Sequence, residues 1–248
     1  MEVIEKKAIS PRFAKSINTY NQHAQVQKSA AHKLYKNIQL KGKVLEIGCG
    51  TGFLSQLLID SPNIDKLYLN DISLDLLQST QNKIQKSKVK LYPLPGNAEN
   101  IALPGNLDAI VSASTFQWFN NFDTFLEKAA KTLKPGGVLA FTSFGPQNFK
   151  EIRKILGIGL DYLTPEEYKI KLSKYFRIEY SLEWTTQQYF KNGLEVLKHM
   201  KYTGVNAFTE GYFGKEKLKR FDADYKHIFA VEGKYPLTYQ PLVFVARM

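Results

Sequence analysis

The sequence predicts an α/β protein in which helices cover both faces of a mostly parallel sheet. Three observations lead to this fold class. Strand-like and helix-like segments alternate over residues 44–144, glycines follow the first strand, and 44% of the 248 residues are hydrophobic. Such alternation forms βαβ units, which place parallel strands side by side and crossover helices on the sheet faces. A chain of this length fits one large core, or a core that carries an insertion.

Each predicted strand in the alternating region is a short apolar run that ends in polar or glycine residues. Residues 44–48 end in glycines, and apolar residues at helical spacing follow from Phe53, which indicates a strand, a turn and a helix. Ser73 is placed to cap the next helix. The predicted strands are residues 44–48, 66–69, 89–92, 108–112 and 138–144, and the later helices are residues 72–86 and 123–133.

The segments outside this region predict a cap and an insertion. Residues 1–42 are polar and rich in Ala, Gln and Lys, which is typical of one or two amphipathic cap helices. Residues 188–234 predict a mostly helical insertion over the carboxyl edge of the sheet. The binding domain is therefore expected to comprise residues 43–187 and 235–248. Its further elements are helices over 148–156 and 165–174, a strand over 176–184 and a closing strand over 237–248.

The charge distribution limits the possible partners. The net charge is +11, and residues 1–42 contribute +6 while residues 188–234 contribute +3. This excess indicates either a docking face for an acidic partner or a solvated, lysine-rich surface. The single cysteine, Cys49, excludes an internal disulfide and leaves no cysteine cluster for structural zinc. Without a signal segment or an apolar run of about 20 residues, we predict a cytoplasmic protein that binds neither a membrane nor a metal.

A glycine-rich motif with two acidic residues predicts a nucleoside site. Glu46 and the following glycines form E-x-G-x-G-x-G at the end of the first strand. The dinucleotide fingerprint G-x-G-x-x-G has a different last spacing and binds a pyrophosphate, so a ligand without phosphates fits better here. Asp71 ends the second strand, where a carboxylate accepts hydrogen bonds from both ribose hydroxyls.

Five motifs in order resemble those of class I S-adenosylmethionine-dependent methyltransferases. They are the glycine motif, Asp71, Gly96-Asn97-Ala98-Glu99, DAIVSASTFQW over residues 108–118 and LKPGG over residues 133–137. The resemblance implies a Rossmann-like, seven-stranded, mostly parallel sheet with an N-terminal helical cap and a helical insertion before the last strand. It implies S-adenosylmethionine as cofactor and S-adenosylhomocysteine as product. The implied cofactor-binding residues are Glu46, Gly48, Cys49, Gly50, Gly52, Asp71, Ile72, Asn97, Ala98, Ser112 and Ser114.

The side chains of Asn97 and Cys49 limit the roles that these two residues can have. Asn97 stands where the class usually has Asp, so it would accept a hydrogen bond from the adenine amino group without a charge. Cys49 has no base among its sequence neighbours, and we expect a small filler rather than a nucleophile.

The two ends of the chain are similar to the malonyl-[acyl-carrier-protein] O-methyltransferase family of biotin synthesis. The similar segments are Arg12-Phe13, residues 20–27, LEVLKHMKYTGVNA over residues 194–207 and YPLTY over residues 235–239. The resemblance implies methyl transfer to the free carboxylate of a malonyl thioester, carried by acyl carrier protein or coenzyme A. A carboxylate is ionised at neutral pH and needs no general base, so no catalytic acid or base is expected.

The remaining site predictions follow from this reaction. We expect Tyr20 to close the cofactor site beside His23, and Phe116 and Trp118 to position the acceptor unless they only pack. Arg153 is the candidate for the malonyl carboxylate, because guanidinium pairs bidentately with carboxylates. The enzyme is expected to be a monomer that binds no nucleic acid. The candidate carrier-protein docking residues are Lys198, Lys201, Lys215, Lys217, Lys219 and Arg220.

Two alternative functions stay open at the level of sequence. The first is methyl transfer to another small acid, a quinol or RNA, although no N-P-P-Y-like signature follows the fourth strand. The second is a partner protein that binds the cofactor without catalysis. Intact Glu46, Gly48 and Asp71 favour an enzyme.

Overall fold

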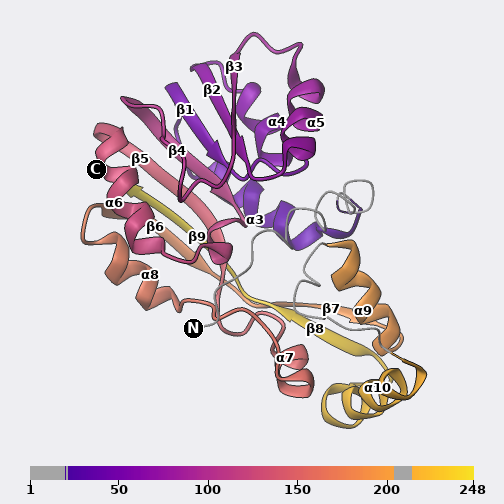
Figure 1. The fold of residues 1–248 in the computed structure, drawn as a ribbon. Coiled ribbons are helices and arrows are strands. Elements are labelled where there is room, and N and C mark those ends of the chain that lie inside the picture. The colour runs from indigo at the N-terminus through magenta and orange to yellow at the C-terminus, as the bar shows by residue number, and fades with distance from the viewer. Residues whose placement is uncertain (1–19, 21, 204–213) are drawn as a thin grey trace.

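The central element of the computed structural model is a seven-stranded sheet with the order β3-β2-β1-β4-β5-β9-β6. Strands β1 to β5 pair in parallel, and β9 runs antiparallel to β5 and β6. The predicted Rossmann-like, mostly parallel sheet is thus confirmed (Figure 1). The structure describes residue 20, residues 22–203 and residues 214–248. The strands are β1 (Gly42–Ile47), β2 (Ile64–Asp71), β3 (Lys90–Pro95), β4 (Leu107–Ala113), β5 (Leu133–Phe144), β6 (Arg177–Glu183) and β9 (Pro241–Arg247).

Helices cover both faces of this sheet, because successive side chains of each strand point to opposite sides and leave two apolar surfaces to bury. On one face, leucines of three helices join valines and leucines of β1 and β2 in one core. On the other face, aromatic and leucine side chains of two helices pack on β5 and β9. The first set is α3 (Gln25–Lys36), α4 (Phe53–Ile59) and α5 (Leu74–Ile84), and the second is α6 (Phe122–Thr132) and α8 (Pro165–Leu172).

Side-chain caps decide where several helices begin. Ser73 Oγ accepts a hydrogen bond from Leu76 N, which confirms the predicted cap and starts α5 at Leu74. Thr164 and Glu167 form a reciprocal capping box at the start of α8. Among the described residues, no helix combines the length and the apolar character that crossing a bilayer requires.

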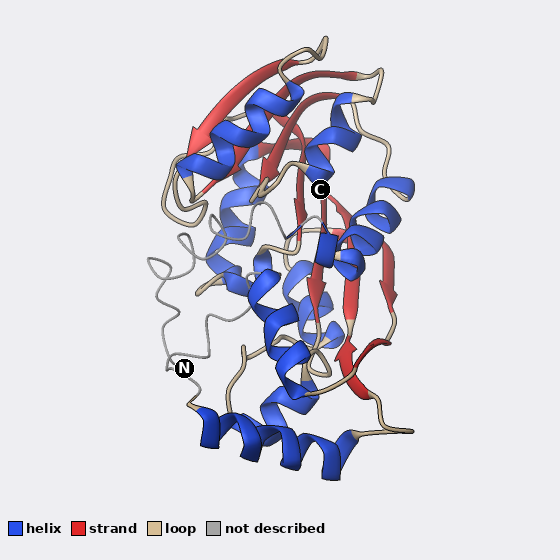
Figure 2. Ribbon diagram, turned by 90° about the vertical axis from the view of Figure 1, so that its right-hand side faces the viewer, coloured by secondary structure: helices blue, strands red, loops and turns tan. Residues whose placement is uncertain are grey.

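A second, smaller layer lies beyond the carboxyl end of the main sheet. Strands β7 (Thr186–Phe190) and β8 (Tyr235–Tyr239) pair antiparallel as a separate two-stranded sheet. The helices α7 (Lys150–Leu156), α9 (Gly193–Tyr202) and α10 (Lys215–Phe229) lie around it (Figure 1) and share a third apolar core with it. Figure 2, turned by 90°, shows this layer below the main sheet. The predicted helical insertion therefore contains α9 and α10, but its first three residues belong to β7.

The prediction of one continuous closing strand over residues 237–248 is wrong. The Gln240 carbonyl accepts a hydrogen bond from Gly145 N at 2.9 Å, and its side-chain Oε1 accepts one from Gln147 N at 2.7 Å. Because Gln240 bonds to this turn instead of to a neighbouring strand, the chain leaves the small sheet as β8 and enters the main sheet as β9. The turn after β5 is thereby held at the junction between the two sheets.

Candidate active site

A cavity of about 160 Å³ lies at the carboxyl ends of β1, β2 and β4, where α3 approaches the sheet. Ligands of open α/β sheets bind at this edge, where the strand order reverses direction. Loops after the strands supply much of the wall, and α3 and the first turns of α4 and α5 contribute further residues. The lining residues that the sequence predicted are Tyr20, Glu46, Gly48, Cys49, Gly50, Asp71, Ile72, Asn97, Ala98, Ser114 and Trp118.

The turn after β1 depends on its glycines. Gly48 has a φ of 68°, and a Cβ at this position would lie 2.2 Å from Thr115 Oγ1. Gly50 has a φ of 53° and donates its N–H to Asp71 Oδ2 at 2.8 Å. Between them Cys49 is 4% exposed, and burial raises the pKa of its thiol well above the ordinary value. A neutral, buried thiol agrees with the expected role as a filler.

Asp71 holds the glycine turn and faces the cavity. Its Oδ2 accepts from Gly50 N and its Oδ1 from Ser73 N, both at 2.8 Å. A carboxylate has about four lone-pair positions, so these bonds leave acceptor capacity for a ligand. Burial raises the pKa of Asp71 above its ordinary value, although the N–H groups of Ser73 and Gly50 oppose this shift. The geometry is compatible with the predicted role toward two ribose hydroxyls.

Glu46 is a second carboxylate in the same wall, and it is almost fully buried. Ser55 Oγ donates to Glu46 Oε2 at 2.6 Å. Burial raises the pKa of Glu46 to about 8, and the nearby charge of Asp71 acts in the same direction. Near neutral pH this carboxyl is therefore largely protonated, and a positively charged ligand would favour its ionised form.

The loop over residues 96–101 closes one side of the cavity. Asn97 Oδ1 accepts from Glu99 N at 3.1 Å, and Lys128 Nζ donates to the carbonyl groups of Ala98, Glu99 and Ile101. Burial lowers the pKa of Lys128. One half-buried ammonium group of α6 thus holds three carbonyls of the loop that the sequence assigns to adenine.

A smaller cavity of about 30 Å³ adjoins the first one. Both cavities include Tyr20, Gln27, Ser114 and Trp118 in their walls. Burial raises the pKa of Tyr20 to about 12, so its phenol stays neutral. Beyond the shared residues, the wall of the smaller cavity continues toward α7 and toward residue 203, which follows the end of α9. Its further lining residues are Gln117, Phe144, Asn148, Phe149, Leu160, Tyr162 and Thr203.

Four of the residues predicted to bind the cofactor or to position the acceptor line neither cavity. His23 stacks on Tyr202, with ring centroids 4.8 Å apart, and so faces α9. Gly52 caps α4 with a φ of 84°, and its Cβ position lies 2.9 Å from Thr80. Ser112 is fully buried one layer deeper and donates to Ile47 O at 2.9 Å.

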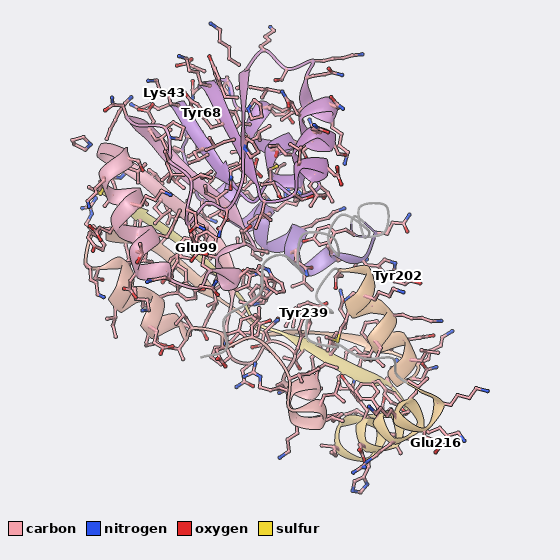
Figure 3. All side chains as sticks on the ribbon, viewed as in Figure 1. Lys43, Tyr68, Glu99, Tyr202, Glu216 and Tyr239 are labelled. Atoms are coloured by element: carbon pink, nitrogen blue, oxygen red, sulfur yellow. The ribbon has the colours of Figure 1, made fainter. Side chains whose placement is uncertain are left out.

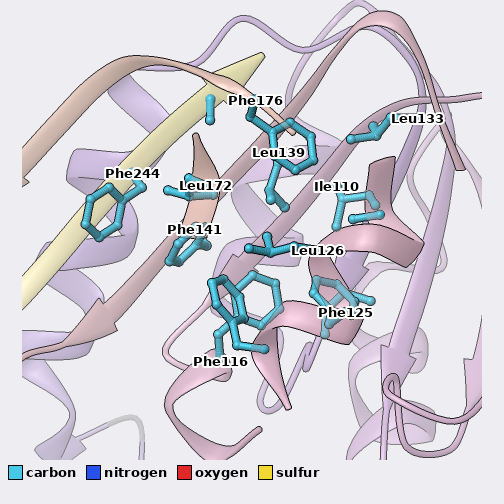
Figure 4. Close-up of a cluster of buried hydrophobic side chains, with 14 of the residues drawn as sticks. Ile110, Phe116, Phe125, Leu126, Leu133, Leu139, Phe141, Leu172, Phe176 and Phe244 are labelled. Carbon is cyan, nitrogen blue, oxygen red and sulfur yellow. The ribbon is translucent and has the colours of Figure 1, made fainter. Parts of the chain in front are cut away.

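The fourth such residue, Phe116, lies in the core on the α6 face (Figure 4). Its ring centroid is 4.9 Å from Phe125 and 5.0 Å from Phe141. It is 2% exposed, so the alternative of simple core packing describes it better than contact with an acceptor. Trp118, two residues later on the short helix η1 (Phe116–Trp118), does line both cavities.

Arg153 lies directly behind the wall of the smaller cavity. Its Nη2 donates to Pro146 O at 2.9 Å and to Asn148 O at 3.2 Å, and its Cζ is 5.8 Å from the centre of the Tyr162 ring. Its Nε is buried without a partner among the described atoms. The predicted docking cations are all exposed on α9 and α10. Lys219 and Arg220 form ion pairs there with Glu216 and Asp224.

Two buried amides of the site, those of Gln27 and Asn148, were not predicted from the sequence to have a role. Gln27 Oε1 and Asn148 Oδ1 have no hydrogen-bond partner among the described atoms. Buried polar atoms are nearly always paired, so each unpaired one requires an explanation. Gln27 stands seven residues after Tyr20, which is about two helical turns, and this spacing was an available signal. Asn148 follows a strand end without any comparable pattern.

Comparisons with known proteins show the family to which the chain belongs. Residues 45–141 match the family model described as a methyltransferase domain. The chain is 35% identical to the malonyl-[acyl-carrier protein] O-methyltransferase of Bacteroides helcogenes over 98% of this chain and 99% of that protein. The chain belongs to the malonyl-[acyl-carrier protein] O-methyltransferase family. The resemblance predicted from the flanking segments, and with it the O-methyltransferase class, is confirmed.

Other members of the malonyl-[acyl-carrier protein] O-methyltransferase family are equally similar. The protein of Calditerrivibrio nitroreducens is 37% identical, with 94% of this chain and 93% of that protein covered. That of Haemophilus influenzae is 36% identical, with 98% and 95% covered.

Two solved structures share the fold. They are the YcgJ protein of Bacillus subtilis (TM-score 0.63, 13% identity, 88% and 97% covered) and an S-adenosylmethionine-dependent methyltransferase of Mesorhizobium loti (TM-score 0.56, 14% identity, 88% and 96% covered). At these identities the likeness concerns the fold alone.

Proposed function

We propose that this enzyme methylates the free carboxylate of a malonyl thioester on acyl carrier protein, with S-adenosylmethionine as the methyl donor. The product is the malonyl methyl ester that primes pimeloyl synthesis for biotin. The observation that carries this proposal is the similarity over both ends of the chain to relatives named for that reaction. The two adjoining cavities support it, because they provide separate spaces for a donor and an acceptor.

The residues of the larger cavity fit this cofactor. S-adenosylmethionine carries positive charge and two ribose hydroxyls, and the cavity offers two buried carboxylates, Glu46 and Asp71. The glycine turn leaves open space beside Gly50, where no atom other than Gly48 O lies within 4 Å of a Cβ position. When bound, S-adenosylmethionine supplies an activated methyl group on a sulfonium centre.

The chain's contribution to the acceptor is orientation and exclusion of water. A malonyl carboxylate is ionised at neutral pH and is itself the nucleophile. Tyr20 and Trp118 line both cavities and so lie where the two substrates meet. Arg153 supplies positive charge behind the acceptor cavity, which favours the ionised acid. The methyl ester has lost its negative charge, so this attraction ends with the reaction and favours release of the product.

An assay of labelled methyl transfer tests the proposal. The purified protein should transfer the label to malonyl-carrier protein, and free malonate and transfer RNA should remain unlabelled. Labelling of transfer RNA or of a quinol would assign the enzyme to another acceptor. Cofactor binding without any transfer would indicate a non-catalytic partner protein.

The basic face of α9 and α10 is proposed to dock the acidic carrier protein. Lys198 and Lys201 are exposed on α9, and the cations of α10 continue this surface. Figure 3 shows Glu216 of α10 at the opposite end of the molecule from Lys43 at the start of β1. The binding domain at residues 43–187 and 235–248 and the insertion at 188–234 would thus divide cofactor binding from docking.

Charge reversal on α10 is expected to weaken binding of the carrier-protein substrate without affecting cofactor binding. Changing Lys215, Lys217 and Arg220 to Glu should raise its apparent KM about tenfold at low salt, because complementary charges steer encounter, while the cofactor Kd stays unchanged. Steady-state kinetics at two salt concentrations measure this. The same reversal at the exposed residues Lys86, Lys88 and Lys90 is the matched control. Kinetics unchanged by the α10 variant would end the docking proposal.

Cofactor affinity is expected to depend on pH through Glu46. Because burial raises the pKa of Glu46 to about 8, a cationic ligand that binds below that pH must displace a proton. The Kd should therefore fall as pH rises toward 8 and flatten above it. The cofactor Kd of Glu46→Gln should equal that of the wild type near pH 6. Near pH 9, where only the wild type has a negative charge at this position, the variant should bind the cofactor about tenfold more weakly. Calorimetric titrations measure both; parallel pH profiles would contradict the assignment.

The adenine loop is expected to loosen when its anchor is removed. Lys128→Met keeps the aliphatic stem and removes the ammonium group that binds three carbonyls. The cofactor Kd should rise roughly five- to tenfold, equivalent to about one lost hydrogen bond net. Lys131→Met is the control on the same helix, since Lys131 is exposed and pairs only with Glu127 in the described structure. Equal Kd values for the two variants would show that the anchor has no effect.

A further inference from the structure

The smaller cavity adjoins the larger one and is suited to a short acyl end. Four wall residues are common to both cavities, which places the smaller one directly beside the larger one. The volume of about 30 Å³ admits only a few atoms. Phe144, Phe149 and Leu160 form much of the wall and shield those atoms from water. A polar group that enters must therefore find its hydrogen bonds in this wall.

Asn148 brings an incomplete hydrogen-bonding group to this wall. It is 2% exposed, and its Nδ2 donates to the Tyr162 hydroxyl oxygen at 2.9 Å. Its Oδ1 has no partner among the described atoms. The N–H of the same residue cannot pair with it, because that N–H donates to Gly145 O. A bound ligand is the natural means of completing the set.

Rotating the amide by 180° completes the hydrogen bonds when the ligand is a carboxylate. The rotation exchanges oxygen and nitrogen without changing the shape of the side chain. Tyr162 then donates its O–H to Oδ1, and Nδ2 donates into the cavity. Burial raises the pKa of Tyr162 to about 12, so the phenol keeps the proton that this arrangement needs. A carboxylate accepts hydrogen bonds only, which matches a donor that points at it.

The surroundings of Asn148 favour a negative charge. The Arg153 guanidinium contacts both the Asn148 carbonyl and the Tyr162 ring, and its Nε is unpaired in the described structure. No Asp or Glu is present among the described residues that line the smaller cavity. Ser114 and Phe149 in the same wall have φ angles of 56° and 54°. Such strain in non-glycine residues collects at functional sites.

We infer that Asn148 is a specificity-determining residue whose amide, held by Tyr162 and backed by Arg153, binds the free carboxylate of the acyl acceptor. It selects the acid over the methyl ester product and, together with the positive charge of Arg153, over the corresponding carboxamide. The inference rests on the proposed function, which supplies the malonyl thioester as the acceptor.

A pair of isosteric probes tests this assignment. Competition binding to the cofactor-loaded protein compares malonyl-carrier protein with the thioester that carries a carboxamide in place of the carboxylate. Carrier-protein docking is common to both probes, so the ratio of their Kd values reports the acyl end alone. The wild type should prefer the carboxylate. Asn148→Asp should shift the ratio toward the carboxamide by at least about tenfold, because like charges repel and the amide can donate to Asp.

The neighbouring variant Gln147→Glu is the matched control. It adds the same charge one residue earlier on an exposed side chain, so the ratio should stay within about twofold of wild type after solvent screening. If Asn148→Asp does not fold, Asn148→Ala takes its place and should abolish most of the carboxylate preference. An unchanged ratio in a folded Asn148 variant, or an equal shift in Gln147→Glu, overturns the inference.

The outcomes for the two proposals are separable. Methyl transfer by the wild type with an unchanged ratio in Asn148→Asp leaves the proposed function intact and removes the role of Asn148. If the carboxylate preference disappears in the variant but the wild type transfers no methyl group, the role of Asn148 stands and the proposed function is overturned. If the wild type binds neither probe, both are overturned.

Discussion

Arg153→Gln is expected to lower kcat/KM for malonyl-carrier protein about 100-fold. Arg153 attracts the carboxylate from behind the cavity wall; at an effective dielectric constant of about 20, two unit charges roughly 6 Å apart interact by about 3 kcal/mol, and each 1.4 kcal/mol corresponds to a factor of ten. The guanidinium also bonds to the carbonyls of Pro146 and Asn148, which shape the turn at the acceptor cavity. Most of the effect should fall on KM, because the charge attracts the acceptor before reaction. Steady-state kinetics with saturating cofactor measure the change.

Two further variants separate charge from structure at this position. Arg153→Lys keeps the charge but loses the planar donor set, so an intermediate loss of about tenfold is expected. Lys154→Gln removes an exposed cation from the next position of α7 and should leave the kinetics unchanged. Thermal unfolding and cofactor titration show whether each variant is folded. A folded Arg153→Gln with wild-type KM would remove this residue from acceptor binding.

Asp71→Asn is expected to raise the Kd for S-adenosylmethionine about 100-fold or more. Two hydrogen bonds to a charged group contribute roughly 1.5–3 kcal/mol each, and an amide keeps only one acceptor atom. That atom cannot serve both Gly50 N and Ser73 N, so one backbone N–H of the turn loses its partner. The variant should therefore lose affinity through both the ligand and the geometry of the turn.

The control for this variant lies four residues along the chain. Asp75→Asn changes the same chemistry on an exposed side chain in the first turn of α5 and should bind normally. Titration with S-adenosylhomocysteine adds a test, because that product keeps the ribose but lacks the sulfonium charge. If Asp71→Asn loses the same factor of affinity for both ligands, the lost interaction is the contact with the ribose. A Kd within about threefold of wild type would contradict the assignment of Asp71, since even one neutral hydrogen bond contributes about 1 kcal/mol.

Local sequence patterns were sufficient to predict the turn after β1 and the residue at the end of β2. A glycine with positive φ leaves a signature in the sequence, because other residues adopt that conformation only at a cost. Gly48, Gly50 and Asp71 therefore mark the larger cavity without knowledge of the packing, and all three line it. Ser73 marks the start of α5 for a similar reason, since the cap and the N–H that it binds are three residues apart.

Predictions that depended on distant contacts were less successful. Phe116 follows β4 at the sheet edge where the site lies, yet Phe125 and Phe141 from other elements draw it into the core. The alternating pattern of residues 237–248 is compatible with one strand, and the turn at Gly145 and Gln147 decides that there are two. In both cases the deciding partner is far away in the sequence.

Short-range backbone preferences and motif order encode the fold class, the family and the loops that form the larger cavity, so these could be predicted from the residues. The construction of the smaller cavity depends instead on packing between distant elements. Asn148 and Tyr162 are 14 residues apart, Gln27 comes from a different helix, and their unpaired or half-paired groups meet only when α3, η1 and α7 pack together. Hydrogen bonding inside a closed cavity depends on which elements exclude water from it, and no local stretch of residues specifies that.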